Sequence, residues 1–293
     1  MSSSTRAWFQ IHFCVILWGF TAILGKAISL PALPLVWWRM TLVTATLLLV
    51  RRFWTGLARL SPRLMATYAG IGVLVAMHWV TFYGSIKLSN ASVAATCMAL
   101  APVFVALIEP VLVGSRFDPR ELFFGLAVIP GAALVVGGTP VEMRLGIAVG
   151  VLSAFLVAIF GSLNKRFVES GEALTVTGLE MGAGALCLTL VAPFAPAAEA
   201  VFVVPGQRDA ILLFALAIGC TLLPFALSFI ALRRLNAFST ALAVSMEPVY
   251  AIVLAMIFFG EQRELTPAFY AGVATILVVV FSHPLMVRRQ RAT

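Results

Sequence analysis

The amino-acid sequence predicts an all-α integral membrane protein with ten transmembrane helices, arranged as two inverted five-helix repeats. Hydrophobic residues make up 61% of the chain and charged residues only 11%, a balance that a soluble domain of this length does not need. Ten apolar runs approach the length that crosses a bilayer. One passage of the first half returns in the second half, which indicates a duplication.

The predicted spans follow the apolar runs in order. A helix needs about 20 apolar residues to cross the hydrocarbon core of a membrane. Strands are excluded because a transmembrane strand alternates in polarity, whereas these runs are apolar on every face. The first run is interpreted as a retained helix, since no small-residue cleavage site of a signal peptide follows it. The spans are expected at residues 8–29, 34–53, 64–86, 91–113, 120–138, 145–165, 173–194, 209–231, 237–259 and 267–287.

The repeated passage divides the chain into two units. Its members recur 146 residues later: Asn90-Ala91 as Asn236-Ala237, Pro102-Val103 as Pro248-Val249, and Gly114 as Gly260. Five helices per unit is an odd number, so the second copy enters the membrane from the opposite side. We therefore expect one transport unit, made of residues 1–141 and of an inverted copy at residues 142–293.

Basic residues indicate the orientation of the helices. With the N-terminus inside, fourteen Lys and Arg residues fall on the cytoplasmic side and five on the other. Both termini are therefore expected in the cytoplasm, at a bacterial inner membrane. The net charge of +8 fits contact with anionic lipids, and no nucleic-acid partner is expected because the basic residues lie at helix ends and form no single patch.

Inverted repeats are typical of transporters whose two halves expose a midplane site alternately to either side. Pro102, Pro224 and Pro248 lie inside predicted spans and are expected to act as hinges. A membrane enzyme is disfavoured because the histidines are scattered and no H-E-x-x-H, G-x-S-x-G or Walker sequence occurs. A channel is disfavoured because no segment resembles a filter. We expect no catalytic residue, no metal site and no cofactor, and a monomer is expected to suffice for transport.

A set of short motifs runs through both halves in a fixed order. They are Trp18-Gly19-Phe20, Lys26, Pro34, Arg39, Tyr83, Asn90-Ala91 and Ala101-Pro102, then Asn236-Ala237, Glu247-Pro248 and Gly260-Glu261. With these motifs the chain resembles the EamA-type members of the drug/metabolite transporter superfamily over nearly its whole length. Ser115 departs from the pattern, since many relatives carry Glu there, and Phe160 and Arg166 match Phe20 and Lys26 only weakly. The resemblance implies an exporter of small metabolites whose cavity is lined by the first, third, fourth, sixth, eighth and ninth helices.

Aromatic side chains concentrate in the third predicted span. At 100° per residue, its four rings cover roughly a third of the helix circumference. They either pack in the core and at the interface, or line the substrate cavity. For His78 the alternatives are a cavity residue that binds substrate or titrates, and a packing residue with satisfied hydrogen bonds. The cavity candidates are Trp18, His78, Trp79, Phe82, Tyr83 and Phe225.

Three charges fall within predicted spans, at Arg39, Glu180 and Glu247. Each costs about 2.5 to 3.5 kcal/mol on insertion scales, so each needs water or a partner. Arg39 and Glu180 occupy corresponding places in the two halves by a rough alignment, and two alternatives are open: the two side chains pair, or Arg39 snorkels to the headgroups. Glu247 precedes Pro248, where an ion site and a structural hydrogen bond at the bend are both open.

An aromatic wall suits an aromatic substrate or an organic cation. From this cluster, and from a resemblance to YddG-type exporters of the superfamily, we expect export of amino acids, aromatic ones in particular. The alternatives are efflux of a hydrophobic organic cation and transport of a nucleoside or sugar conjugate. Facilitated transport is expected, and proton coupling through Glu247 or His78 is the alternative.

Overall fold

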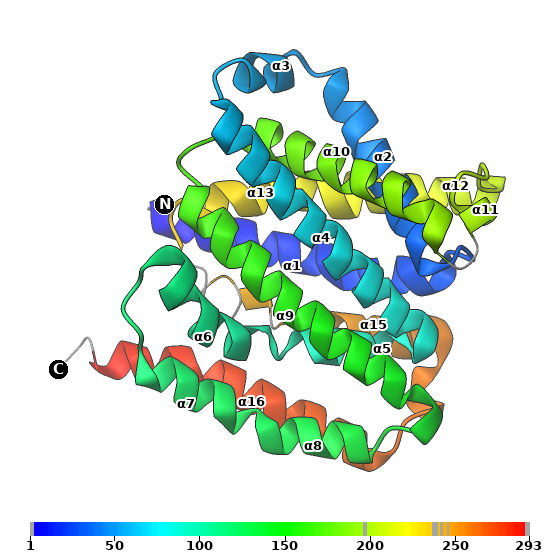
Figure 1. Cartoon of the computed structure of the whole chain (residues 1–293). Helices are drawn as coiled ribbons and strands as arrows, with labels where there is room; N and C mark the ends of the chain where they lie inside the picture. Colours follow the sequence, from blue (N-terminus) through cyan, green and yellow to red (C-terminus); the bar gives the residue numbers. More distant parts are fainter. Residues whose placement is uncertain (1–2, 196–197, 236–239, 241–242, 245, 291–293) are drawn as a thin grey trace.

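The computed structural model describes residues 3–195, 198–235, 240, 243–244 and 246–290, and within these ranges the chain is built from helices and their connections (Figure 1). The repeated pair Asn236-Ala237 lies outside the described residues. The first part of the chain forms α1 (Ser3–Ala27), α2 (Ala32–Leu48), α3 (Arg51–Leu57), α4 (Pro62–Leu88), α5 (Ala91–Met98), α6 (Ala101–Val113), α7 (Pro119–Ala127) and α8 (Ile129–Gly137). The second part forms α9 (Arg144–Phe167), α10 (Ala173–Val191), α11 (Ala198–Val201), α12 (Gln207–Phe214), the π-helical η3 (Ala215–Leu222), α13 (Leu223–Leu232), α15 (Glu247–Phe259) and α16 (Pro267–Gln290). Single 3₁₀ turns lie at η1 (Val141–Met143), η2 (Ala192–Phe194) and η4 (Glu261–Arg263).

Many of these helices have the length and polarity of membrane spans. In the described part of the chain, six helical stretches are long and apolar enough to cross a membrane, and the bent pair α2–α3 is a seventh if it forms one span. Three shorter apolar helices lie at Gly125–Gly137, Glu247–Phe259 and Pro267–Val279. All of these segments overlap predicted runs, and the chain is a multi-pass helical membrane protein.

The second predicted span ends earlier than expected. α2 stops at Leu48, and α3 leaves it at an angle of 88°. Arg51 and Arg52 open α3 and are exposed, because two adjacent guanidinium groups are costly in the apolar interior of a membrane. The indole N–H of Trp54 donates to the carbonyl oxygen of Leu48 at 2.8 Å and so satisfies an acceptor that the bend leaves without a helical donor. The prediction of a continuous span to residue 53 is therefore wrong at its carboxyl end.

Prolines mark the starts of helices inside three predicted spans. Pro102, Pro224 and Pro248 are each the second residue of their helix, α6, α13 and α15. A proline has no N–H to donate, and in the first turn that donor has no helical acceptor anyway. α6 is separated from α5 by a break at Ala99–Leu100, and α13 follows the π-helical η3. New helices therefore start at these prolines, and the role of the prolines as hinges stays a prediction.

The repeated glycines adopt the same conformation in the two halves. Gly114 ends α6 with φ of 77°, and Gly260 ends α15 with φ of 66°. Each N–H donates to the carbonyl four residues earlier, at Pro110 and Met256. A left-handed residue at this position costs little only for glycine. The turn at Gly260 therefore repeats the local structure of the turn at Gly114.

The long helices pack in pairs that join the two halves. α4 packs along α9 and α1 along α13, while α2 lies on α10, α5 on α15 and α8 on α16. Figure 1 shows α7 and α8 lying along α16 at one edge of the bundle, with α2, α3 and α10 toward the opposite edge. A Cβ atom at Gly131 would lie 2.8 Å from the carbonyl oxygen of Gly272, so this part of the α8–α16 contact depends on a small residue.

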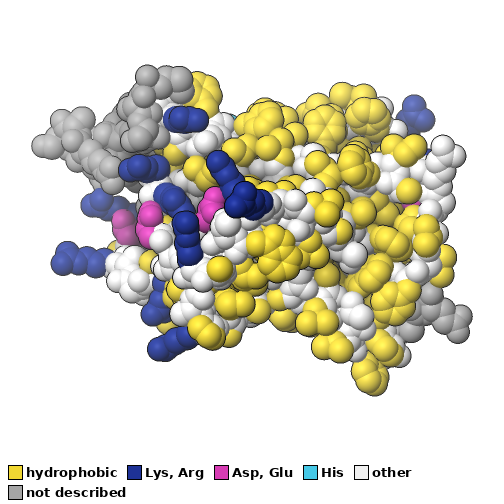
Figure 2. Space-filling model, turned by 90° about the horizontal axis from the view of Figure 1, so that it is seen from above, with side chains coloured by type: hydrophobic (Ala, Val, Ile, Leu, Met, Phe, Trp, Pro, Cys, Tyr) yellow, Lys and Arg dark blue, Asp and Glu magenta, His cyan; other side chains and the backbone are white. Residues whose placement is uncertain are grey.

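The two ends of the bundle differ in charge. At one end, which we call the basic end, Lys165, Arg166 and Arg233 donate to backbone carbonyl oxygens at 2.7 to 2.8 Å. Figure 2 shows Lys and Arg side chains gathered toward this end of the molecule. At the opposite end, which we call the Asn90 end, Lys87 donates to the carbonyl of Ile28 at 2.6 Å. The separation of charge fits the asymmetry of basic residues in the sequence.

Candidate substrate cavity

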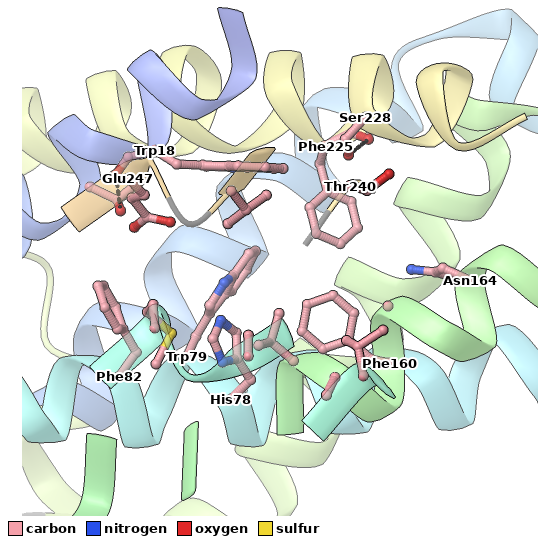
Figure 3. Close-up of a pocket in the computed structure, with 18 of the residues that line it drawn as sticks. Trp18, His78, Trp79, Phe82, Phe160, Asn164, Phe225, Ser228, Thr240 and Glu247 are labelled. Atoms are coloured by element: carbon pink, nitrogen blue, oxygen red, sulfur yellow. Dashed lines mark hydrogen bonds between the residues drawn. The ribbon is translucent and has the colours of Figure 1, made fainter. Parts of the chain in front are cut away.

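A cavity of about 140 Å³ lies between the two halves of the chain (Figure 3). Its walls come from α1, α4, α5, α6, α9, α13 and α15, the helices that the sequence resemblance implied, and from α2. Most of the lining is apolar, which suits a ligand that buries rings or alkyl groups. The polar and charged side chains of the lining are Thr21, Arg39, His78, Asn164, Ser228, Thr240 and Glu247.

Aromatic rings form much of the wall. The lining includes five of the six cavity candidates, Trp18, His78, Trp79, Phe82 and Phe225. The centroids of His78 and Phe160 lie 5.4 Å apart, and those of Trp79 and Phe225 lie 6.0 Å apart. These distances are in the range of favourable ring contacts, so the rings support one another across the cavity and present edges and faces to it.

His78 both lines the cavity and has a partner inside the protein. The hydroxyl of Ser153 donates to the His78 carbonyl oxygen at 2.9 Å, so its proton is not available to the ring. The ring Nδ1 lies 3.0 Å from the Ser153 carbonyl oxygen and 2.8 Å from the hydroxyl oxygen. Nδ1 therefore carries the proton of the neutral ring, and Nε2 is left as an acceptor. His78 is therefore a cavity-lining residue whose Nδ1–H has a partner, and its contact with substrate stays a prediction.

Arg39 is buried, with 2% of its surface exposed, and is held by groups from other helices. Its Nε donates to the Thr221 hydroxyl at 2.5 Å, Nη1 to the Tyr83 hydroxyl at 2.7 Å and Nη2 to the Cys220 carbonyl at 3.4 Å. The guanidinium carbon also lies 3.7 Å from the centroid of the Trp79 ring, a cation–π contact. Snorkelling is therefore wrong for this side chain.

The Cys220 carbonyl is free for Arg39 because of the local sequence. Pro224 lies four residues later and has no N–H, so the carbonyl one turn before it lacks its α-helical donor. The same segment is π-helical, and π-helical turns are frequent at functional sites. Pro224 thus helps to build the site that holds a buried cation.

Tyr83 differs from the other aromatic candidates. It is fully buried and does not line the cavity. Its ring packs against Gly25 of α1, and its hydroxyl accepts the hydrogen bond from Arg39. One residue further along α4, its side chain turns away from the face that carries Phe82. The expectation that Tyr83 contacts substrate directly is therefore corrected to a role in positioning Arg39.

Glu247 brings a carboxyl group to the same cavity. It is the first residue of α15, is buried, and lines the cavity near Trp18 (Figure 3). It is close enough to Arg39 to interact electrostatically, yet the two form no ion pair within 4.0 Å among the described residues. The cavity therefore holds a cation and an acid that do not neutralise each other by direct contact.

Glu180 lies elsewhere. It is fully buried in α10, does not line the cavity, and neither carboxyl oxygen has a hydrogen-bond partner. A pair between Glu180 and Arg39, one of the alternatives drawn from the sequence, is not formed, because Arg39 points between α4 and η3 and bonds to Thr221, Tyr83 and Cys220. The corresponding positions of Arg39 and Glu180 in the two halves did not predict a contact between them. The side chains of corresponding residues need not face each other across a pseudo-symmetry axis.

The cavity lining also includes residues that were not among the sequence candidates, and Phe160 and Asn164 are two of them. Phe160 was noted only as a weak counterpart of Phe20, yet Phe160 lines the cavity whereas Phe20 is exposed on the outside of the bundle. Asn164 is a polar amide in an otherwise apolar run, and such residues inside spans usually face the protein interior. That signal was available in the sequence.

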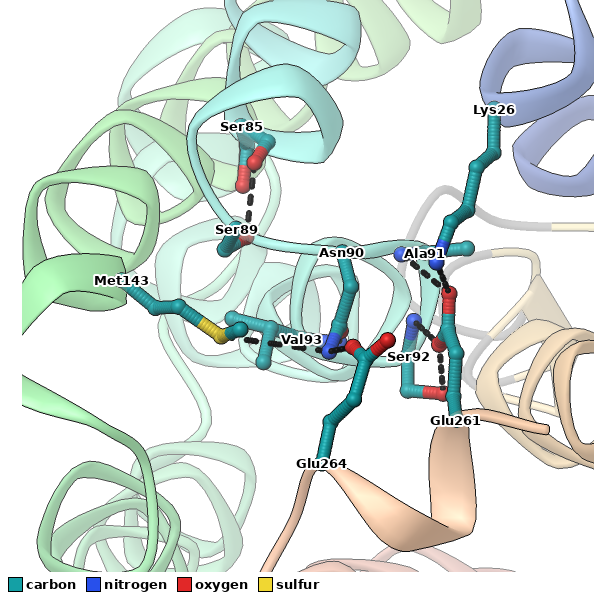
Figure 4. Close-up of polar contacts among 10 residues, drawn as sticks. All are labelled: Lys26, Ser85, Ser89, Asn90, Ala91, Ser92, Val93, Met143, Glu261 and Glu264. Carbon is teal, nitrogen blue, oxygen red and sulfur yellow. Dashed lines mark hydrogen bonds and ion pairs between the residues drawn. The ribbon is translucent and has the colours of Figure 1, made fainter. Parts of the chain in front are cut away.

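A second polar cluster lies at the Asn90 end (Figure 4). The carboxylate of Glu261 is fully buried and accepts hydrogen bonds from Lys26 Nζ at 2.7 Å, from the backbone N–H of Ala91 at 3.2 Å and Ser92 at 2.9 Å, and from the Ser92 hydroxyl at 2.5 Å. These backbone N–H groups open α5 and have no helical acceptor. We call Lys26, Ala91, Ser92 and Glu261 the Glu261 network. It ties α1, the start of α5 and η4 together.

Asn90 extends this cluster. Its Oδ1 accepts from the N–H of Val93 at 2.9 Å, which caps α5, and its Nδ2 donates to Glu264 at 3.1 Å. The first Asn of the repeated passage is therefore a helix cap that also contacts the turn after α15.

The bundle has the features of a small-molecule membrane transporter: it is multi-pass and helical, and a mostly apolar cavity with a few charged side chains lies between its halves. The chain belongs to the EamA-like transporter family, whose model matches residues 7–137 and again residues 144–282. Membership of this family makes the protein a transporter and not an enzyme.

Similar proteins carry the same general description. The chain is 26% identical to the uncharacterized transporter YxxF of Bacillus subtilis over 233 residues, which is 75% of this chain and 69% of YxxF. It is 25% identical to an uncharacterized transporter of Archaeoglobus fulgidus over 203 residues, 68% of this chain and 70% of the relative. One protein crystal structure aligns with 98% of this chain and 99% of its own, with a TM-score of 0.69 and 20% identity, a likeness in fold alone.

Proposed function

We propose that the protein exports amino acids, aromatic ones in particular, through the cavity between its two halves. The observation that carries the proposal is the pair of unneutralised charges, Arg39 and Glu247, in a cavity walled by aromatic rings. An amino acid zwitterion has a carboxylate and an ammonium group on one carbon. Arg39 is placed to attract the carboxylate and Glu247 the ammonium group.

The aromatic residues fit the side chain of such a substrate. Trp18, His78, Trp79, Phe82 and Phe225 are the proposed contacts, since all five line the cavity. A ring pair adds about 0.5 to 1.5 kcal/mol beyond area burial. Nε2 of His78 is an acceptor that can take a further N–H of the ammonium group.

The proposed transport unit has ten helices in two inverted repeats, residues 1–141 and 142–293, with both termini in the cytoplasm of a bacterial cell and the basic end inside. The support is the repeated local structure at Gly114 and Gly260 and the pairing of α4 with α9 and of α1 with α13. In a two-fold arrangement these two pairs exchange, as the third helix corresponds to the eighth and the sixth to the first. Rocking of the halves about Pro102, Pro224 and Pro248 would alternate access to the cavity.

The alternative substrate is a hydrophobic organic cation, which Glu247 and the rings would also attract. Arg39 in the same cavity opposes a ligand that is only positive, because like charges repel at short distance. A nucleoside or sugar conjugate stays a further alternative, and channel or enzyme activity a remote one.

The test is uptake into liposomes that contain the purified protein, with phenylalanine, tryptophan, leucine, a quaternary aromatic cation and a nucleoside offered one at a time. Aromatic amino acids should be transported most rapidly, and Trp79→Ala should weaken transport by about tenfold or less because one ring contact is lost. Met77→Ala is the matched control, since Met77 precedes His78 on α4 but is 48% exposed on the outer face. Preference for the cation over every amino acid, or equal loss in both variants, would contradict the assignment.

A further inference from the structure

Glu180 is a buried acid with nothing to balance it. None of its surface is exposed, both carboxyl oxygens lack a hydrogen-bond partner, and it takes part in no ion pair among the described residues. An ionised carboxylate is strongly disfavoured in such surroundings, because burial removes its hydration and nothing replaces it. The arrangement of this part of the chain therefore suits the neutral acid.

The neighbours of Glu180 share its lack of partners. Thr177 lies three residues earlier on the same face of α10, and its hydroxyl oxygen is buried without a hydrogen bond. From α9, the side-chain amide of Asn164 is close enough to act on the Glu180 carboxyl, and its Oδ1 is also without a donor. A proton on Glu180 would form an O–H group that can donate to Thr177 or Asn164. A single proton would therefore satisfy both Glu180 and one of these two oxygens.

Asn164 connects this place to the cavity. Its side chain lines the cavity wall, and Figure 3 shows its amide nitrogen directed toward the cavity. The same side chain is close enough to Glu180 to act on its carboxyl group. Glu180 thus lies one side chain behind the cavity.

The other titratable groups around Glu180 are either exposed or hydrogen-bonded to other partners. Tyr68 of α4 faces it, but its hydroxyl donates to the Phe167 carbonyl at 2.8 Å. Arg233 at the end of α13 is exposed and donates to the Gly171 carbonyl at 2.8 Å. Arg51 and Arg52 of α3 are exposed, and Arg39 of α2 is held by its own three acceptors. None of these groups supplies a counter-charge to Glu180.

We propose that Glu180, with Asn164 and Thr177, forms a proton-binding site behind the cavity, and that its protonation is coupled to substrate export. Glu180 takes a proton from cavity water to form an O–H bond, and returns it to water when the carboxylate forms again in the other state of the cavity. This inference rests on the proposed transport function and replaces the facilitated transport expected from the sequence. Neither Glu247 nor His78 is needed as the proton carrier.

The site itself is tested without substrate. Infrared difference spectra of the purified protein across a pH titration should contain the carbonyl band of a protonated carboxylic acid, and Glu180→Gln should remove that band. Glu109→Gln is the matched control, because Glu109 is also a buried carboxyl but does not line the cavity and lies in α6. Because Glu247 is a second buried acid, the decisive result is the change in the band: a band that is the same in Glu180→Gln and the wild type, or no band in the wild type, overturns the site even if aromatic amino acids are transported.

Coupling is tested in liposomes with an imposed pH gradient and labelled phenylalanine. If one proton exchanges for one substrate, a gradient of about one pH unit supports up to about tenfold accumulation. Glu180→Gln should abolish this accumulation and keep counterflow exchange at zero gradient, whereas Glu109→Gln should keep both. Glu180→Asp, which retains the acid, should keep accumulation with a shifted pH dependence and serves if the Gln variant does not fold.

Two results would overturn the coupling. One is accumulation driven by a sodium gradient and not by a pH gradient, which would make the oxygen cluster a sodium site. The other is gradient-driven accumulation that survives in Glu180→Gln. A failure of the proposed substrate is distinguished from both, because counterflow of phenylalanine would then be absent in the wild type while the infrared band of Glu180 remains.

Discussion

The ends of α6 and α15 are alike in backbone and different in what they hold. Both helices close on a left-handed glycine, Gly114 and Gly260. After Gly260 comes Glu261, a buried carboxylate that binds Lys26 and the start of α5, whereas after Gly114 comes Ser115, which is exposed. A serine cannot bridge a cation and a helix N-terminus in this way. One residue therefore makes the Asn90 end more strongly tied than the equivalent turn at the basic end.

This difference bears on transport. If the two halves rock about a central cavity, opening the Asn90 end separates α1, α5 and η4 and breaks the Glu261 network. Opening the basic end would break no equivalent network, because Ser115 has no carboxylate. We therefore expect the two access states to differ in stability, with the closed Asn90 end favoured. The following variants test the contrast.

Glu261→Ser gives the second copy the residue of the first and should have the largest effect. It removes the carboxylate from Lys26, Ala91 and Ser92 and leaves buried N–H donors without an acceptor, for a loss of about 3 kcal/mol in unfolding free energy. Chemical denaturation in detergent micelles measures this loss. Ser115→Ala is the control and should change stability by less than about 0.5 kcal/mol. Similar values for the two variants would remove the contrast between the turns.

Gly114→Ala and Gly260→Ala should cost the same, about 1 to 2 kcal/mol each, because an L-residue is strained at these φ angles. A Cβ atom at either position meets no other atom within 4 Å, so the cost comes from the backbone alone. Equal shifts of the denaturation midpoint would show that the two turns are equivalent in local structure. A difference of more than about 1 kcal/mol would mean that surroundings, and not the backbone, set the cost.

Lys26→Met should cost about 1 kcal/mol, less than Glu261→Ser. The Lys26 side chain is 28% exposed, so solvent screens its ion pair, and the N-terminus of α5 still stabilises the carboxylate. Lys26→Arg, which keeps the charge, is the control. A loss as large as that of Glu261→Ser would place most of the interaction in the ion pair and little in the helix N-terminus.

Ser115→Glu is the converse change and should have the smallest effect, a gain of roughly 0.5 kcal/mol. Arg166, the weak counterpart of Lys26, lies close by, since it donates to the Leu112 carbonyl at 2.7 Å. An ion pair formed there would be exposed and therefore weak. The double variant Ser115→Glu, Arg166→Gln should lose the gain, and a gain that persists would exclude this pair as its cause.

The second predicted span shows how far apolar periodicity reaches. Length and composition located α2 correctly, but they continued it to residue 53, while the structure bends by 88° after Leu48. Hydropathy averages over a window and so cannot place a turn that two arginines and one indole hydrogen bond decide. The same limit applies to the break between α7 and α8, which one predicted run covered as a single helix.

The sequence predicted several of the side chains that line the cavity, but it did not predict which side chains contact one another. Trp18, His78, Trp79, Phe82 and Phe225 were named from residue type and from the helices that the family resemblance implied, and all line the cavity. Tyr83 belongs to the same aromatic stripe of α4, yet it does not line the cavity, and its hydroxyl accepts a hydrogen bond from Arg39. A 100° step between neighbours decides which side chain reaches the cavity, and a stripe one third of the circumference wide includes residues on either side of that boundary.

The sequence by itself determined that this protein is a helical membrane transporter, and it named side chains able to line a cavity, because hydrophobicity, helix period and short motifs are local properties of the chain. Only the tertiary structure decided the partners of its buried charges. Arg39 bonds to Thr221 and Tyr83 and not to Glu180, Glu261 reaches across the chain to Lys26, and Glu180 is left beside Asn164. These contacts join residues that are far apart in sequence. They depend on the directions in which the side chains point, and only the packing of the helices sets those directions.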